Sequence, residues 1–323
     1  MKTRTSANNR DYVSEVRPAV QHAEVPADRA GQRIDNFLAT RLKGVPKSMV
    51  YRLLRTGQVR VNGRRAKPDQ RLCEGDDVRI PPVRVAERDA PEPPAPGRMA
   101  DIEAAIIHED REFLVIDKPS GVASHGGSGI NFGVIELLRA ARPRETLELV
   151  HRLDRDTSGV LVLSRKRSAL TALQAAIREG RVEKRYLALI QGAPAQAKMP
   201  VDLPLRKSVL QGGERMVRVD PDGKPSRSTL RTVSRHGAAT LIEVALETGR
   251  THQIRVHCAH IGHPVAGDEK YGDADFNRAL RAKGLKRLFL HAARFEFALG
   301  ERAYGFSAPL PQELSKVLDA LDG

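Results

Sequence analysis

The sequence predicts an α+β protein with two domains. We expect a small N-terminal domain of two helices and short strands, followed by a larger domain in which helices flank a mixed, mainly antiparallel β-sheet. A chain of 323 residues has room for two hydrophobic cores. Residues 81–98 contain six prolines, which is typical of a semi-stiff linker. Beyond them, short β-branched and aliphatic runs are separated by turn residues, a pattern that favours strands.

These features divide the chain into four segments. We expect a disordered basic tail at 1–27, the small domain at 28–84, the Pro-rich linker at 85–98 and the larger domain at 99–323. The tail is polar and has no sustained periodicity. Three of its basic residues are expected to add loose phosphate contacts: Lys2, Arg4 and Arg10.

The charge of the chain favours a polyanionic partner. Fifty-four Lys and Arg against 40 Asp and Glu give a formal net charge of +14 and a pI near 10.1. An acidic membrane surface is the alternative, but no apolar run is long enough to span a membrane and no signal peptide opens the chain. Cys73 and Cys258 lie far apart, which indicates neither a disulfide framework nor a zinc site. We therefore expect a cytoplasmic protein without membrane contact.

The small domain shows two helices and a hairpin. Apolar residues recur at helical spacing from Ile34 to Leu42, and Ser48 is placed to cap a second helix that ends before Gly57. Asn62-Gly63 is the strongest two-residue hairpin signal, and residues 76–80 supply a last strand.

This domain is also expected to bind phosphates. From Arg29 to Lys67 the chain has eleven basic residues and one acid, Asp35, whereas a solvated helix face usually mixes both signs. Aromatic residues are few (Phe37 and Tyr51), so the contacts should be to the backbone of a nucleic acid rather than by base stacking. The candidate contact residues are Arg33, Lys43, Lys47, Arg52, Arg55, Arg60, Arg64, Arg65 and Lys67.

The larger domain begins with a strand at 113–116 that ends in the turn 117–121. Lys118 in that turn either meets a phosphate or is a plain turn residue, and the pattern leaves both open. Residues 126–129 are Gly-rich but lack the strand-to-helix context of a nucleotide-binding loop, so we exclude that class of site.

The segment 151–159 is the candidate catalytic loop. It places two carboxylates, Asp154 and Asp156, immediately before an unbroken apolar strand at 160–163. On spacing alone, a structural turn whose carboxylates cap backbone N–H groups is the favoured alternative.

The remaining elements follow in order. A helix is expected at 169–177, and strands at 184–189, 229–233, 240–246 and 288–292, with a final helix at 311–321. Thr251 is placed to cap a helix that reaches about Ile261. Four histidines surround this helix, namely His252, His257, His260 and His263. No metal-binding spacing accompanies them, so they are expected to be structural or to face RNA.

His151-Arg152-Leu153-Asp154 with Thr157-Ser158-Gly159 resembles the signature of the RluA-type pseudouridine synthases. These enzymes detach uracil from its ribose in RNA and rejoin it through carbon. Other stretches resemble further elements of the family in the same order: 117–121, 184–189, 248–257 and 262–268. Residues 32–38 and 57–63 resemble the S4 RNA-binding module. The resemblance covers residues 29–321.

The resemblance implies a role for five residues. Asp154 would be the catalytic carboxylate, Tyr186 would stack on the flipped uracil, and Arg255 would pair with Asp154. Arg152 is expected to fill the gap that the flipped base leaves, and Asp156 to be structural. One carboxylate can either attack C1′ or remove the 2′ proton, and the sequence does not choose between these routes.

The resemblance also implies the partners. We expect a monomeric isomerase that needs no metal and no small-molecule cofactor. Its substrate would be specific uridines of 23S ribosomal RNA, either free or in a precursor particle. Two alternatives stay open: another branch of the family that acts on other uridines of the same RNA, and a non-catalytic ribosome-assembly factor.

Overall fold

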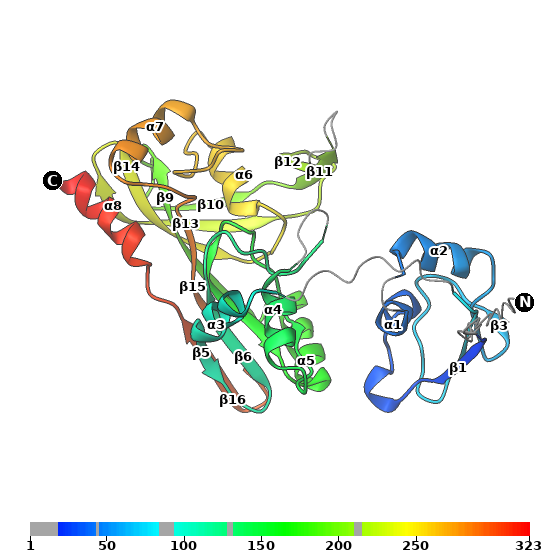
Figure 1. Ribbon diagram of the computed structural model, residues 1–323. Coiled ribbons are helices and arrows are strands. Elements are labelled where there is room, and N and C mark those ends of the chain that lie inside the picture. Colours follow the sequence, from blue (N-terminus) through cyan, green and yellow to red (C-terminus); the bar gives the residue numbers. More distant parts are fainter. Residues whose placement is uncertain (1–18, 43–44, 84–93, 128–131, 210–214) are drawn as a thin grey trace, which may run out of the picture. The chain divides into compact units, whose positions relative to one another are not determined.

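The computed structural model describes residues 19–42, 45–83, 94–127, 132–209 and 215–323. The chain divides into two compact units, Met1–Glu92 and Pro93–Gly323 (Figure 1). The hydrophobic core of the small unit draws only on residues 23–83, and those of the large unit only on residues 99–321. Each unit therefore buries its own apolar surface.

In the small unit, two helices and a four-stranded antiparallel sheet share one core. The helices are α1 (Ile34–Arg41) and α2 (Lys47–Arg55), preceded by a 3-10 turn, η1 (Ala27–Arg29). The strands, in their order across the sheet, are β1 (Gln21–Glu24), β4 (Asp77–Ile80), β2 (Arg60–Val61) and β3 (Arg64–Arg65). The apolar stripe of the first helix is buried as predicted.

The hairpin prediction is confirmed. Asn62 and Gly63 have φ values of 49° and 75°, the left-handed conformations that a tight two-residue turn between β2 and β3 requires. Gly57, with φ of 72°, follows the end of α2 as expected. The prediction for Ser48 is wrong, because α2 begins at Lys47 with Pro46 at the N-cap and no side chain caps it.

Part of the predicted tail belongs to the small unit. Residues 1–18 lie outside the described residues, but Gln21–Glu24 form β1, which pairs antiparallel with β4. Ala23 of this strand and Val25, just after it, are buried in the core. Only these two apolar side chains alternate there, which is too short a pattern for a strand to be predicted from sequence.

The large unit is built on a mixed, mainly antiparallel sheet of ten strands. Across the sheet run β10 (Lys198–Asp202), β13 (Arg227–His236), β14 (Ala239–Leu246), β9 (Val182–Gln191), β15 (Leu290–Leu299), β8 (Ser158–Ser164), β6 (Phe113–Lys118) and β5 (Ile106–Glu109). Two more strands join this path: β16 (Arg302–Ser307) pairs with β15, and β7 (Glu148–Leu149) with β8. A separate hairpin joins β11 (Leu205–Val209) to β12 (Arg215–Val219). Within the sheet only β8 and β15 run parallel in the described residues.

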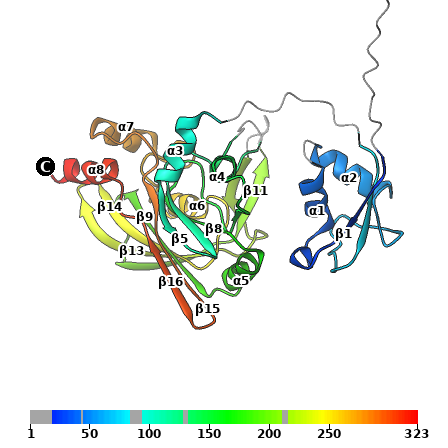
Figure 2. The ribbon, with the colours of Figure 1, turned by 60° about the horizontal axis from the view of Figure 1, so that its bottom comes forward.

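Six helices cover this sheet (Figure 2). They are α3 (Pro96–Ala104), α4 (Val134–Ala141), α5 (Arg167–Arg178), α6 (Gln253–His260), α7 (Ala274–Ala282) and α8 (Gln312–Asp322). Helices α3 and α4 pack on one face of β6 and β8, where alternate residues such as Leu161 and Leu163 point. Helix α5 packs on the other face, against Val160 and Val162. Helices α7 and α8 contact β9 and β14 through a third cluster.

Two boundaries differ from the prediction. The predicted linker 85–98 falls largely outside the described residues, but its last part, from Pro96, is the first turn of α3. Proline is tolerated there because a first-turn N–H has no helical acceptor. Thr251 does not cap α6; the N-cap is His252, in the left-handed conformation.

Candidate active site

The loop that carries Asp154 connects β7 to β8 and is fastened on both sides. Leu153 exchanges two hydrogen bonds with the hydroxyl of Ser124, at 2.8 and 2.9 Å. The hydroxyl of Ser120 donates to the carbonyl of Asp156 at 2.8 Å. Gly159, at the start of β8, has a φ of 107°, and a Cβ there would collide with the backbone of Ala292 on β15. The loop is therefore held by main-chain contacts that do not depend on its catalytic side chains.

Lys118 is a structural residue of this loop. Its ammonium is fully buried and donates to the carbonyls of Pro119, Val122 and Arg155 at 2.7–3.0 Å. Burial lowers its pKa to about 7, against the opposing charges of Asp156 and Asp154. The phosphate-binding alternative for Lys118 is wrong, because all three hydrogen bonds of the ammonium point into the protein.

Arg255, on α6, lies between two carboxylates. Its Nε and Nη2 donate to the two oxygens of Asp268 at 2.6 and 2.7 Å. Its third nitrogen, Nη1, lies 3.6 Å from Oδ2 of Asp154. The sequence prediction joined Arg255 to Asp154, and the structure brings them together. However, Arg255 makes its two hydrogen bonds to Asp268 and not to Asp154.

The charges of Asp154, Arg255 and Asp268 stabilise one another. Burial alone would lower the pKa of Arg255, but hydrogen bonding to Asp268 and the charges of Asp268 and Asp154 raise it overall. Burial alone would raise the pKa of Asp268, whose side chain is fully buried. Hydrogen bonding to Arg255, its charge and the backbone N–H groups of Tyr271 and Lys270 hold that pKa below its usual range.

His252 also faces Asp154. Its Nε2 lies 3.9 Å from Oδ2 of Asp154, and its Nδ1 is 2.8 Å from the hydroxyl of Tyr271. The residue has a φ of 54°, which is uncommon for a residue other than glycine and is concentrated at functional sites. Burial lowers its pKa, so the imidazole is neutral at physiological pH.

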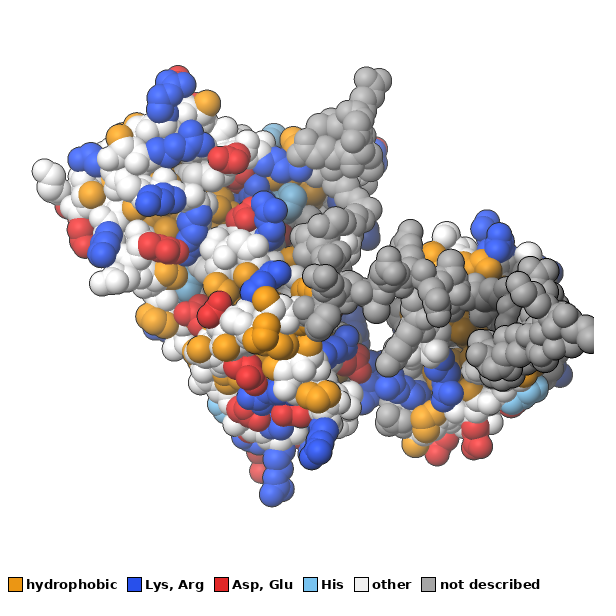
Figure 3. All heavy atoms as spheres, viewed as in Figure 1, with side chains coloured by type: hydrophobic (Ala, Val, Ile, Leu, Met, Phe, Trp, Pro, Cys, Tyr) orange, Lys and Arg blue, Asp and Glu red, His pale blue; other side chains and the backbone are white. Residues whose placement is uncertain are grey.

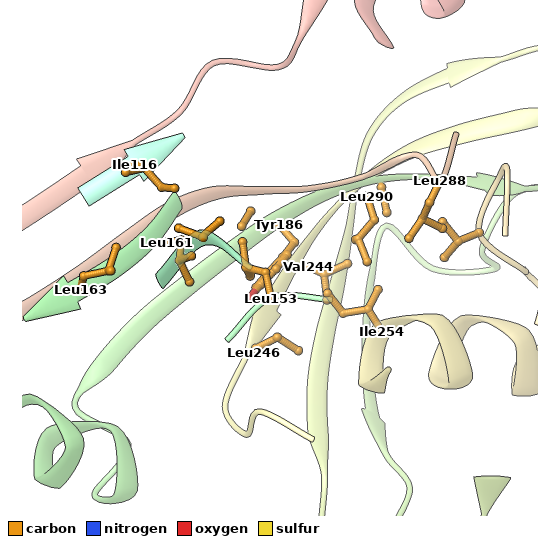
Figure 4. Packing of buried hydrophobic residues seen from close by; sticks show 14 of the residues in the cluster. Ile116, Leu153, Leu161, Leu163, Tyr186, Val244, Leu246, Ile254, Leu288 and Leu290 are labelled. Carbon is orange, nitrogen blue, oxygen red and sulfur yellow. The ribbon is translucent and has the colours of Figure 1, made fainter. Parts of the chain in front are cut away.

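Tyr186 lies beside Asp154 on β9. Its ring is buried in the main core, among Leu153, Val244 and Leu290 (Figure 4). Burial and the charge of Asp154 raise the pKa of its phenol, which therefore keeps its proton at neutral pH. A small cavity of about 80 Å³ is lined by Asp154, Tyr186 and Arg255 together. The three predicted catalytic residues thus share one site.

Two larger cavities open from the same loop. One, of about 820 Å³, is lined by Asp154, Arg255 and several cations, namely Arg155, Lys270, Arg281, Lys286 and Arg287. The other, of about 640 Å³, is lined by Asp154, Tyr186 and Arg152, and continues to Lys184 and Arg250. On the face that Figure 3 shows, cationic and anionic side chains of the large unit are intermixed. This face of the large unit therefore presents no surface made of cations alone.

The chain matches a family model described as RNA pseudouridylate synthase over residues 112–260, and a model of the S4 domain over residues 32–78. Ribosomal large subunit pseudouridine synthase C of Escherichia coli (strain K12) is 52% identical over 311 residues, which cover 94% of this chain and 97% of the relative. The protein of the same name from Pasteurella multocida (strain Pm70) is 50% identical over 310 residues, 95% of each chain. The chain belongs to the RNA pseudouridylate synthase family.

Solved structures agree with this assignment. Human RNA Pseudouridylate Synthase Domain Containing 4 has a TM-score of 0.59 at 25% identity and covers 70% of this chain and 95% of that chain. Human RNA Pseudouridylate Synthase Domain Containing 1 has a TM-score of 0.54 at 26% identity, over 67% and 94%. The expected S4 module, the α+β fold and the isomerase class are confirmed.

All but one of the basic residues expected to bind RNA lie on the S4 module, a different unit of this pseudouridine synthase from the one that contains Asp154. Six of them are exposed: Arg52, Arg55, Arg60, Arg64, Arg65 and Lys67. Arg33 is instead engaged by Asp35 through two hydrogen bonds of 2.7 and 3.1 Å. Lys43 and the side chain of Lys47 lie outside what the structure describes. Arg152 is on the catalytic loop, exposed, with Nη1 2.9 Å from Nε2 of His125.

The histidines of the synthase are mostly structural. His257 is buried and bonded to Ser226, Ser228 and the carbonyl of Leu203. His263 bonds to the carbonyl of Gln191. Among the described residues, no group of three or more His, Cys, Asp or Glu is arranged to hold a metal ion. Nor does the described part of the chain contain a helix long and apolar enough to cross a membrane.

Sequence reasoning missed two residues of the site, Asp268 and His252. Asp268 was placed in a loop of the family pattern without a role, and His252 was grouped with structural or RNA-facing histidines. Asp268 has no local signal, because a carboxylate after a glycine is typical of any turn. The available signal for His252 was its position directly before the helix that carries Arg255.

Proposed function

We propose that this pseudouridine synthase isomerises specific uridines of 23S ribosomal RNA. Relatives about 52% identical over 94% of the chain bear the name ribosomal large subunit pseudouridine synthase C. The S4 module, on which six of the predicted contact residues are exposed, supports a role in RNA binding. Such a substrate places the enzyme in the cytoplasm, on free ribosomal RNA or on a precursor particle.

The single observation that carries the mechanism is the position of Asp154. Its carboxylate lies at the meeting point of three cavities, with Nη1 of Arg255 at 3.6 Å and Tyr186 beside it. One carboxylate is sufficient for this reaction, because uracil leaves C1′ through nitrogen and returns through C5, so no second group has to activate water. Asp154 acts either as nucleophile at C1′ or as the base that takes the 2′ proton.

Arg255 and Tyr186 complete the proposed mechanism. Arg255 orients Asp154 through the nitrogen that Asp268 leaves free. Tyr186 presents its ring to the flipped uracil. Because its phenol is protonated, Tyr186 can accept the C5 proton only if its own proton passes on, and Asp154 is the nearby acceptor. Arg152, exposed on the same loop, is proposed to occupy the space that the flipped base leaves.

The test compares two neighbouring carboxylates. Asp154→Asn is nearly isosteric, so it should bind RNA normally and form no pseudouridine. Asp156→Asn is the matched control, because Asp156 pairs with Arg155 at 3.0 Å and is expected to keep most of the activity. Pseudouridine is mapped in 23S ribosomal RNA from a strain lacking the protein and complemented with each variant. Turnover by Asp154→Asn, or equal loss in both variants, would refute the assignment.

A further inference from the structure

The cavity of about 640 Å³ beside Tyr186 contains a buried cation with no partner. Lys184 is only 8% exposed, and among the residues that the structure describes its side chain makes no hydrogen bond and no ion pair, although its Nζ is not fully enclosed. The other buried cations of the large unit are satisfied: Lys118 by three carbonyls and Arg255 by Asp268. A buried charge is unfavourable unless it is paired, so Lys184 is the exception that requires an explanation.

The position of Lys184 points to the substrate. It precedes Tyr186 by two residues on β9, so both side chains emerge on the same face of the strand, roughly 7 Å apart along it at a rise of about 3.3 Å per residue. Both line the cavity that begins at Asp154. The ammonium is thus within reach of a nucleotide whose base lies on Tyr186.

The charged group that acts most directly on Lys184 is another cation, Arg250. Arg250 lines the same cavity and uses its Nε for the carbonyl of Pro225, at 3.1 Å. Gly249 has no side chain to cover the ammonium, and a Cβ there would lie 4.0 Å from Nζ of Lys184. Burial, then the charge of Arg250, lowers the pKa of Lys184, and no carboxylate opposes them. Asp154 is the carboxylate that lines this cavity, and within the described residues it faces His252 and Arg255 rather than Lys184 or Arg250. Lys184 and Arg250 can therefore bind an anion that the protein does not supply.

His151 is close enough to Lys184 for the charge of the lysine to affect its pKa. Its ring stacks on Phe295 at a centroid distance of 4.7 Å, and its Nε2 accepts a hydrogen bond from the backbone N–H of Val162. Burial, with the charge of Lys184, lowers the pKa of His151 to about 3, so the imidazole is neutral. Within the described parts of the chain, no carboxylate forms an ion pair with the ammonium of Lys184.

We propose that Lys184 and Arg250 form a phosphate subsite, which binds a phosphodiester of the RNA next to the uridine held at Tyr186. The inference rests on the proposed function and deepens it. Phosphates are the anions of RNA, and a bound phosphate would pair with both cations at once. A uracil carbonyl is the alternative acceptor, but a neutral group would leave the buried charge uncompensated.

The test uses the full-length enzyme with Lys184→Met, which keeps the length of the side chain and removes its charge. Lys198→Met is the matched control, because Lys198 is exposed on β10 and lines none of the cavities beside Asp154. Binding of a single-stranded, uridine-containing RNA oligonucleotide is measured over a range of salt concentrations. Lys184→Met should weaken binding roughly tenfold at low salt and reduce the slope of log K against log salt by about 0.7. Lys184→Arg should restore most of the affinity.

A second measurement does not depend on turnover or on RNA. Inorganic phosphate should raise the melting temperature of the wild-type enzyme and of Lys198→Met, and raise that of Lys184→Met much less. In the absence of phosphate, Lys184→Met should be at least as stable as the wild type, because it removes an uncompensated buried charge.

An unchanged salt slope with an equal phosphate effect would overturn the subsite. Normal affinity with a lower rate at saturating RNA would also overturn it, because Lys184 would then act on the base. These outcomes are separate from a failure of the proposed function. If 23S ribosomal RNA keeps its pseudouridines without this protein while the oligonucleotide results hold, the subsite stands and the substrate is another RNA.

Discussion

The guanidinium of Arg255 is fixed by two hydrogen bonds to Asp268, at 2.6 and 2.7 Å, and the same orientation holds its Nη1 3.6 Å from Asp154. A buried arginine that served only the catalytic carboxylate would be free to pair with it at two points. Here the two-point face of the guanidinium is occupied by Asp268, which is fully buried, and only Nη1 is left to face Asp154. We therefore propose that Asp268 influences the reaction by fixing the position of Arg255.

The first prediction concerns this positioning. Asp268→Asn removes a buried charge and turns an amide donor toward the donors of Arg255, so the guanidinium should leave its place. We expect a loss of stability of about 3 kcal/mol, the range for breaking one side of a buried ion pair. Single-turnover activity should fall roughly a hundredfold, the cost of a catalytic group misplaced by about 1 Å. Asp275→Asn is the control, since its pair with Arg278 is exposed. Normal activity at normal stability would contradict the role.

The second prediction is that charge alone does not replace Arg255. Arg255→Lys keeps a cation but cannot bind Asp268 at two points and still face Asp154. Activity should drop sharply while the protein stays folded, as measured by single-turnover assays and circular dichroism. Because Asp268 works through Arg255, the double variant with Asp268→Asn should be less impaired than the product of the two single effects. A Lys variant with wild-type rates at every pH would show that guanidinium geometry is unimportant.

The third prediction separates the two roles of Tyr186. Its hydroxyl makes no hydrogen bond with the described residues, so Tyr186→Phe should leave stability unchanged within about 0.5 kcal/mol. RNA binding should also be normal, since the ring still stacks. Turnover should be very slow or stop after glycosidic cleavage, followed as loss of the C5 hydrogen. Weak binding with normal turnover of the bound RNA would instead indicate a packing role.

The fourth prediction follows from the buried ammonium of Lys118. Burial lowers its pKa to about 7, whereas the unfolded chain keeps the ordinary value of 10.5. Between these values the unfolded state binds more protons, so stability rises with pH, by at most about 1.4 kcal/mol per pH unit. Below pH 7 both states are protonated and the contribution is constant.

Lys118→Met should remove this rise. Urea denaturation between pH 6 and pH 10 would show the wild type gaining stability relative to the variant above pH 7. The exposed Lys198→Met is the control and should follow the wild type at each pH. Parallel curves for the wild type and Lys118→Met would contradict the lowered pKa.

The contrast between Asp154 and Asp268 shows how far the sequence alone leads. Asp154 precedes an apolar strand, and Tyr186 and Arg255 fall within a strand and a helix whose patterns are local. Such patterns, together with a resemblance to known motifs, are sufficient to predict those elements and to bring the three residues to one site. The apolar runs at 113–116 and 160–163 became central strands for the same reason.

The rest of the site depends on contacts between residues distant in sequence. Asp268 is buried because α6 places Arg255 against it, and no pattern around a glycine-aspartate turn indicates that neighbour. Lys118 could not be assigned because its three acceptors are main-chain carbonyls, one of them at Arg155. The left-handed conformation of His252 at the N-cap of α6 is likewise not indicated by the residues around it in the sequence.

The last prediction concerns the S4 module. Its core lies entirely within residues 23–83, while the cores of the catalytic unit begin beyond residue 98. Deleting residues 1–84 should therefore leave a folded catalytic unit. The deletion removes the six exposed candidate contact residues together with other basic side chains, and each lost contact should reduce the salt slope of RNA binding by about 0.7–0.9. The fragment should bind ribosomal RNA more weakly, with a shallower salt dependence, and modify fewer sites.

A full-length variant separates loss of charge from loss of the module. The side chains of Arg64 and Lys67 are exposed and make no hydrogen bond or ion pair with the described residues, so Arg64→Gln with Lys67→Gln should not disturb the S4 fold. This variant should lie between the wild type and the deletion in salt slope, and Lys198→Gln should match the wild type. Pseudouridine is then mapped site by site for each protein. Equal slopes and equal site occupancy in all of them would mean that the catalytic unit alone selects its uridines, through cavities such as the one that holds Lys184.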